Sequence, residues 1–250
     1  MPYLRPVGWY SELLKFERDI AQVSELILLF SESPGSLAEL GAFAMDDEIA
    51  PKMLVVIDDE SYNRTSFIRL GPIYSLMTDY GDNSVCVIKL SEHNIGNLSS
   101  CANIDLSTFS QFMRTQVLGR VKKTEKRGLI RDRHGHLIKV ITGLIQYYAS
   151  LTMTEILDLL SKMQLAVTEE RTHQLLNCAS LLGWIKIEKI GLNTFHSGVA
   201  ENLALTFDLI DGVVPEFDRE RWRGDIRVYW QLNDPDRFAC IRAAVRSASQ

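Results

Sequence analysis

The chain lacks long hydrophobic runs and paired cysteines. It contains no stretch of about 18 apolar residues, and its first residues, which include Pro2, Arg5 and Pro6, do not resemble a signal peptide. The four cysteines are scattered, and none stands in a CxxC pair. These absences argue against a membrane-spanning helix and against a zinc or redox motif. We therefore expect a cytoplasmic protein with free thiols, no membrane partner, no metal and no cofactor.

Negative charge is concentrated in the first part of the chain. Residues 1–110 contain 7 Lys and Arg against 16 Asp and Glu, whereas residues 111–250 contain 20 against 16. The length of 250 residues allows one large domain or two small ones, and a hydrophobic content of 46% is enough for a core. The net charge is therefore negative in the first segment and positive in the second, which predicts two units with different partners. We place them at residues 1–105 and 106–250.

The first half alternates between helical patterns and short apolar runs. The runs suit strands that are buried on both faces of a parallel sheet, and they cover residues 26–30, 53–57 and 85–90. Helical patterns cover residues 11–23, 37–45 and 67–77. This order predicts an α/β domain with a doubly wound, flavodoxin-like sheet. Ligands of such sheets bind beyond the carboxyl ends of the strands, which points to loops 31–36 and 58–66.

Two helices and a hairpin are predicted in the second half. The first helix is capped by Thr154, and the second runs from Thr168 to Leu182 and ends at Gly183. The segment WIKIEKI alternates like a strand, and a turn at residues 191–193 leads to a partner strand. Helix, turn, helix and hairpin is the order of a winged helix. We therefore expect a mainly α C-terminal domain that contains a winged helix.

The segment SESPGSLAELGAFA, residues 31–44, suggests chemistry. Gly35 and Ser36 follow a strand and begin a helix, and free N–H groups at a helix start favour an anion such as phosphate. Glu39 lies one turn further on, where a carboxylate can attack an anomeric carbon or stabilise an oxocarbenium-like transition state. Glu17, on the preceding helix, can contact sugar hydroxyls or manage a proton on the leaving base. Alternatively, Ser36 and Glu39 form an S-x-x-E capping box and Glu17 is a solvated helix residue.

Residues 12–80, which include ESPGSLAELGAF and SFIRLGPI, resemble the nucleoside deoxyribosyltransferase-like effectors of bacterial retrons. These are toxin-like anti-phage proteins that pair such a domain with a C-terminal winged helix, and the resemblance extends weakly over residues 150–200. It implies that Glu39, in the ELG motif, is the nucleophile and that Glu17 helps to bind the sugar. A further Asp of the transferases, six residues before the nucleophile, falls on Ser33 here. The expected substrate-binding residues are Glu17, Glu32, Ser33, Gly35 and Ser36.

Domains of this kind begin with a strand and a glycine-containing loop, and the sequence ahead of Leu26 contains neither. We therefore expect a sheet that lacks its first strand. The implied function is a retron toxin that cleaves or transfers an N-glycosidic bond of a nucleotide or NAD-like substrate. Its implied partners are the retron reverse transcriptase and its RNA–DNA hybrid, and a homo-oligomer is left open. The alternative is a non-catalytic DNA-binding regulator whose degenerate α/β domain senses a nucleotide.

A basic run, RVKKTEKRGLIRDRHGH, occupies residues 120–136. Between Arg114 and Arg133 there are eight basic residues and two acidic ones. Such a run suits the phosphates of a structured nucleic acid, and the expected contacts are Arg120, Lys122, Lys123, Lys126 and Arg127. The alternative is an ordinary solvated surface. His134 and His136 have no third ligand nearby, which argues against a metal site.

Overall fold

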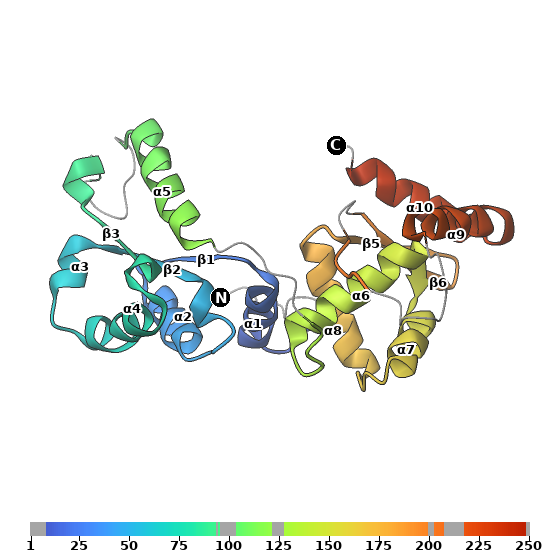
Figure 1. The fold of residues 1–250 in the computed structure, drawn as a ribbon, viewed down its shortest axis with the longest axis horizontal. Helices are drawn as coiled ribbons and strands as arrows, with labels where there is room; N and C mark the ends of the chain where they lie inside the picture. Colours follow the sequence, from blue (N-terminus) through green and yellow to red (C-terminus); the bar gives the residue numbers. More distant parts are fainter. Residues whose placement is uncertain are drawn as a thin grey trace. The chain divides into compact units, whose positions relative to one another are not determined.

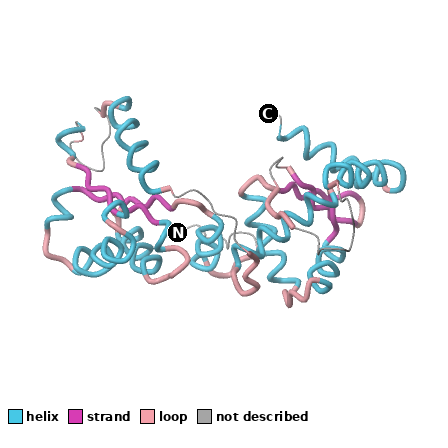
Figure 2. Tube along the Cα trace, viewed as in Figure 1, coloured by secondary structure: helices cyan, strands magenta, loops and turns pink. Residues whose placement is uncertain are grey.

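The structure is a computed structural model that describes residues 9–93, 95, 104–121, 128–199, 203–207 and 218–248. Packing divides the chain into two units, whose elements are shown as a ribbon and as a tube (Figures 1 and 2). The first unit, Ser24–Arg127, is called the α/β unit below. The second joins Met1–Val23 to Gly128–Gln250 and is called the helical unit. The helical unit therefore takes residues from both ends of the sequence.

A three-stranded parallel sheet in the order β1-β2-β3 forms the centre of the α/β unit. Its strands are β1 (Ile27–Phe30), β2 (Met53–Asp58) and β3 (Val85–Ile88). The connections contain α2 (Pro34–Ala44), η1 (Ala50–Lys52), α3 (Asp59–Asn63), η2 (Arg69–Ile73), α4 (Tyr74–Tyr80) and η3 (Asp82–Ser84), and η4 (Leu90–His93) follows β3. Every residue of β2 is buried, as suits an apolar central strand. The expected mixed α/β content with a parallel sheet is confirmed.

Helix α5 (Leu106–Arg120) belongs to the α/β unit. Its apolar face packs against buried residues of β2 and β3, and the packed side chains are Phe109, Phe112, Met113 and Val117. Burial of this face determines where the helix lies, because removing apolar surface from water is the main favourable term in folding. The division by packing therefore falls between Arg127 and Gly128, whereas the sequence placed a boundary between residues 105 and 106.

The helical unit contains an antiparallel sheet in the order β4-β6-β5. Its elements are α1 (Leu13–Val23), α6 (His134–Tyr148), β4 (Ser150–Thr152), α7 (Met153–Lys162), α8 (Glu169–Leu181), β5 (Ile185–Ile190), β6 (Asn193–Gly198), α9 (Arg219–Asn233) and α10 (Pro235–Ala248). The expected order of two helices and a hairpin is present in α7, α8, β5 and β6. Helix α7 begins earlier than expected, because its N-cap is Thr152, in a capping box with Glu155, and not Thr154.

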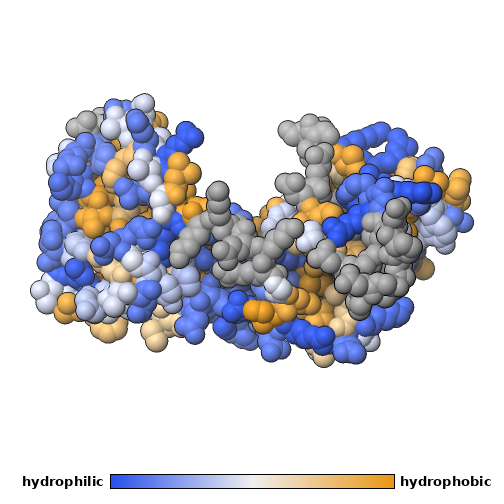
Figure 3. Space-filling view, in the orientation of Figure 1, coloured by the Kyte–Doolittle hydropathy of each residue, from blue (hydrophilic) through white to orange (hydrophobic). Residues whose placement is uncertain are grey.

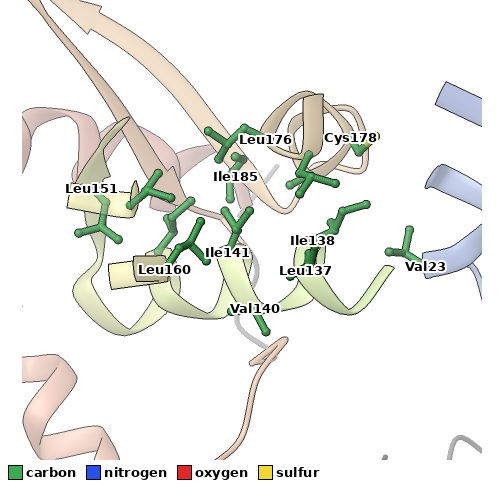
Figure 4. Packing of buried hydrophobic residues seen from close by; sticks show 14 of the residues in the cluster. Val23, Leu137, Ile138, Val140, Ile141, Leu151, Leu160, Leu176, Cys178 and Ile185 are labelled. Carbon is green, nitrogen blue, oxygen red and sulfur yellow. The ribbon is translucent and has the colours of Figure 1, made fainter. Parts of the chain in front are cut away.

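One hydrophobic cluster joins α1, α6, α7, α8 and β5. Ile138 and Ile141 of α6 lie close to Leu176 of α8 and Ile185 of β5 (Figure 4). Val23, at the end of α1, belongs to the same cluster. Helix α1 is thus part of the helical unit, although the sequence placed it in the domain of residues 1–105. An amphipathic pattern predicts an apolar face but not the partner that buries it.

The helices that the structure describes are short. The longest, such as α5 and α6, have 15 residues. At a rise of about 1.5 Å per residue such a helix is about 22 Å long, less than the ~30 Å of a hydrocarbon core. In the described part of the chain, no helix combines the length and hydrophobicity that a membrane crossing requires.

Candidate functional site

The carboxyl ends of the three strands meet at one edge of the parallel sheet. The register pairs Phe30 of β1 with Val56 of β2, and Asp58 of β2 with Ile88 of β3. Ser31, directly after β1, is fixed at this edge because its N–H and its hydroxyl both donate to the Val56 carbonyl, at 2.9 and 3.2 Å. The two loops that the sequence indicated as a ligand site, 31–36 and 58–66, therefore begin at the same edge.

A pocket of about 130 Å³ lies at this edge. It is lined by the ends of the strands and by α5, with Phe30, Leu90 and Phe109 among its mostly apolar walls. Glu32 and Asp58 supply carboxylates. Figure 3 shows hydrophobic residues gathered over this part of the α/β unit, beside α5. An apolar cavity of about 150 Å³ can hold a benzene molecule, so this pocket has room for about one ring.

Helix α2 is separated from the end of β1 by three residues and is capped by serines. Ser33 is the N-cap, and Pro34 occupies the first helical position, where its fixed φ suits the helix. The Ser36 N–H donates to Ser33 Oγ at 3.2 Å, and the Ser33 N–H donates to Ser36 Oγ at 3.0 Å. This reciprocal pair is the capping box of α2. A bound phosphate would have to share the Ser33 and Ser36 N–H groups with it.

Glu39 takes no part in the cap. It lies in the second turn of α2, beside the fully buried Leu40, and its own side chain is half-buried. The alternative prediction that Ser36 and Glu39 form a capping box is wrong, because the N-cap of the helix is Ser33, three residues before Ser36. Within the described residues, Glu39 has no hydrogen-bond or ion-pair partner. The fold therefore does not account for this carboxylate.

The other expected substrate-binding residues are divided between the two units. Glu32 is exposed and lines the pocket, and Gly35 is exposed in the first turn of α2. Ser33 and Ser36 lie in the same turn, with their side chains engaged in the cap. Glu17 lies on α1, in the helical unit, and is half-buried. Its contact with a sugar stays a prediction.

Arg120 has a structural environment. Its side chain is buried, and its guanidinium donates to the carbonyl oxygens of Met53 at 2.8 Å, Pro51 at 2.9 Å and Tyr80 at 3.0 Å. Burial lowers the pKa of Arg120. Because these bonds occupy the donors, we leave Arg120 out of the expected phosphate contacts. The remaining four, Lys122, Lys123, Lys126 and Arg127, lie outside the described residues.

Sequence patterns did not reveal a buried polar cluster in the helical unit. Asp19 of α1 is 1% exposed and forms a bidentate pair with Arg171 of α8, with both N–O distances 2.7 Å. It also accepts the Tyr10 hydroxyl at 2.5 Å and lies 3.0 Å from His134 Nδ1. Burial raises the pKa of Asp19, but hydrogen bonds from His134, Arg171 and Tyr10 outweigh it and lower the pKa to about 2. Asp19 is therefore ionised at neutral pH.

The two histidines considered as metal ligands have separate partners. His134 Nδ1 faces Asp19, whereas His136 Nδ1 accepts the Ile130 N–H at 2.9 Å. Both rings therefore serve local structure. Among the described residues, no group of three or more His, Cys, Asp or Glu side chains could hold a metal ion.

Comparison with known proteins identifies the family. The family model described as STM3845 retron effector protein matches residues 6–187. Because this match covers most of the chain, the chain belongs to that family and is a retron effector protein.

Two curated relatives come from Escherichia coli. One, "Retron Ec86 putative ribosyltransferase/DNA-binding protein", is 28% identical over 126 residues, which are 50% of this chain and 39% of the relative. The other, "Retron Ec73 putative ribosyltransferase/DNA-binding protein", is 36% identical over 64 residues, which are 26% of this chain and 20% of the relative. The chain thus spans about two fifths of the first relative's length and one fifth of the second's.

Proposed function

We propose that the α/β unit cleaves or transfers an N-glycosidic bond of a nucleotide or NAD-like molecule, as the toxic activity of a retron effector in anti-phage defence. The observation that carries this proposal is Glu39, a half-buried carboxylate on the helix that follows β1, which the fold does not use. The pocket at the carboxyl edge of the same unit's sheet, which Glu39 itself does not line, and the word ribosyltransferase in both relatives' names support the same class of reaction.

Glu39 would act on the anomeric carbon of the substrate. As its carboxylate forms an ester bond to this carbon, the bond to the base nitrogen breaks, and the base leaves with the bonding electron pair and takes a proton from solvent. Water then hydrolyses the ester, or a second base takes the sugar. A pocket that holds about one ring suits a nucleobase or a nicotinamide. In this proposal Glu32, Ser33, Gly35 and Ser36 contact the sugar and phosphates, and Glu17 contacts sugar hydroxyls.

We further propose that the α/β sheet is doubly wound and flavodoxin-like and that residues 134–198 form a winged helix. The order α6, β4, α7, α8, β5, β6 and the antiparallel pairing of β5 with β6 support this assignment. The helical unit would then bind nucleic acid, with the retron's RNA–DNA hybrid and reverse transcriptase as partners. The term DNA-binding in both relatives' names also supports a second candidate, a non-catalytic regulator.

Glu39→Gln separates these two functions. The substitution keeps the size of the side chain and removes its charge, so we expect release of base from a nucleotide panel that includes NAD to fall by about 10³-fold. Stability should change by no more than about 0.5 kcal/mol, because the side chain has no partner among the described residues. Chromatography of released base, alongside survival of expressing cells, measures the effect.

Asp79→Asn is the matched control, because Asp79 is an exposed carboxylate of α4 in the same unit. It should release base like the parent. Glu17→Gln should raise KM more than it lowers kcat if Glu17 orients sugar hydroxyls. A Glu39→Gln protein that is as toxic as the parent at equal expression would favour the regulator.

A further inference from the structure

Helix α8 has little free surface. Every residue from Arg171 to Ser180 is buried or half-buried, and only the helix ends, Glu169, Glu170 and Leu181, are exposed. In the proposed winged helix, α8 is the helix that would enter the major groove of DNA. Such a helix must present several polar side chains to base edges. In this conformation the polar side chains between Arg171 and Ser180 are at most partly exposed, so α8 has little surface for such contacts.

The segment Trp9–Val23, called the N-terminal cover below, occupies part of this surface. The Trp9 ring stacks on the His173 ring, with centroids 3.9 Å apart and planes at 11°. The Gln174 side-chain amide donates to the Trp9 carbonyl at 3.4 Å. Tyr10 is 1% exposed, and its hydroxyl lies 3.0 Å from Cys178 Sγ. Residues of the cover therefore contact α8 along two turns.

The same cover neutralises a cation of α8. The bidentate pair of Asp19 with Arg171 leaves the Arg171 side chain 20% exposed. Arginine is the side chain that most often contacts guanine or phosphate in DNA complexes. With Asp19 bound, both terminal nitrogens of Arg171 are engaged, one of them also with Gln174 Oε1 at 2.7 Å, so this fork is not open to bidentate contact with a guanine or phosphate.

The docking of the cover on α6 depends on a close backbone approach. The Gly135 N–H donates to Gln22 Oε1 at 3.0 Å. A Cβ atom at Gly135 would lie 2.8 Å from the Gln22 carbonyl oxygen, a distance that real Cβ atoms do not reach. The glycine at this position therefore allows α1 to lie against α6, and the contact is specific.

We propose that the N-terminal cover and nucleic acid compete for α8, so that the helical unit binds a DNA duplex tightly only after the cover is displaced. We rely here on the nucleic-acid role proposed above for this unit. Only residues 24–26 separate the cover from β1, the strand whose carboxyl end lines the pocket, so the two are close neighbours along the chain. Displacement of the cover would thus link nucleic-acid binding by the helical unit to the α/β unit through the continuous chain.

The first test releases the cover in the full chain. In the variant Trp9→Ala with Asp19→Ala, hydrogen exchange should accelerate in residues 9–23 and in α8. Fluorescence anisotropy with a labelled 20-base-pair duplex should show binding at least about tenfold tighter than in the parent, with a steeper dependence on salt. The matched control is Glu12→Ala with Lys15→Ala, which removes an exposed ion pair of the same segment and should bind like the parent.

A second test needs no substitution and decides the matter if the release variant does not fold. Because competition is reciprocal, saturating the parent with duplex should accelerate hydrogen exchange in residues 9–23. The proposal is overturned if the parent binds duplex while hydrogen exchange in the cover stays unchanged. It is also overturned if the release variant exposes its cover but binds duplex no more tightly than the parent. Repeating both tests in the Glu39→Gln background separates this proposal from the catalytic one, since duplex binding does not need Glu39.

Discussion

Replacing Arg120 with alanine tests whether the start of the basic run is structural. The substitution removes the donors that reach Met53, Pro51 and Tyr80 and leaves their carbonyl oxygens buried. Each hydrogen bond from a charged donor contributes about 1.5–3 kcal/mol, but the contributions do not add because the cost of burying the cation disappears as well. We expect the free energy of unfolding of the α/β unit to fall by about 3–5 kcal/mol, because several buried carbonyl oxygens lose their donor at about 1–3 kcal/mol each.

Hydrogen exchange measures this loss without assuming that both units unfold together. Amides of β2 and β3 that open by unfolding of the α/β unit should exchange roughly 10²- to 4 × 10³-fold faster, since about 1.4 kcal/mol corresponds to a factor of ten. Arg114→Ala is the control, because Arg114 is exposed on the same helix. If Arg120→Ala left exchange unchanged but weakened binding to an RNA–DNA hybrid, Arg120 would be a phosphate contact and our reasoning would be refuted.

Three further predictions concern other parts of the chain. Asp19 has a pKa near 2, below the value of about 3.9 in an unfolded chain, so its contribution of roughly 2 kcal/mol is complete above about pH 5 and is lost as the pH falls towards 2. Acid titration followed by circular dichroism should show a shallower loss of folded structure with falling pH for Asp19→Asn than for the parent. Identical acid unfolding curves would contradict the pairing of Asp19 with Arg171. In Gly35→Ala the new Cβ would meet only Ser33 Oγ, at 3.7 Å, so stability should not change, but KM for the nucleotide should rise because Gly35 is an expected substrate contact. Gly41→Ala is the control: nothing lies near its Cβ, and KM should not change. Equal KM values in the Gly35→Ala and Gly41→Ala variants would show that Gly35 does not contact the substrate. Reversing the charges of Lys122, Lys123 and Lys126 should flatten the salt dependence of RNA–DNA hybrid binding, measured by titration at several salt concentrations. Equal slopes for the parent and the variant would mean that the basic run is an ordinary solvated surface.

The sequence predicted the strands of the α/β unit well, because a short apolar run flanked by turn residues allows few other structures. It predicted the start of α2 less well. Ser33 and Ser36 are both good N-caps, and Glu39 completes the S-x-x-E pattern with Ser36. Pro34 was the better signal, since it is favoured in the first turn and so places the cap at Ser33.

The sequence could not predict which unit the helices α1 and α5 join. Each has an apolar face, but the residues that bury it are distant in the chain: α1 packs against α6 and α8, and α5 packs on β2 and β3. The same limit applies to Arg120, which resembled its basic neighbours until the carbonyl groups of Pro51 and Met53 were seen around it. Such contacts follow from the tertiary arrangement and have no local pattern.

Helix α1 carries both a structural and a predicted functional carboxylate. Glu17 and Asp19 are two residues apart, so about 200° of rotation separates them on the helix. Asp19 therefore binds Arg171 on one face of α1, while Glu17, the expected sugar contact, projects from another. Because both side chains belong to the same helix, displacement of α1 from α8 moves Glu17 together with Asp19. If Glu17 does contact the sugar, displacement of the N-terminal cover by nucleic acid would change the KM for the nucleotide without touching Glu39.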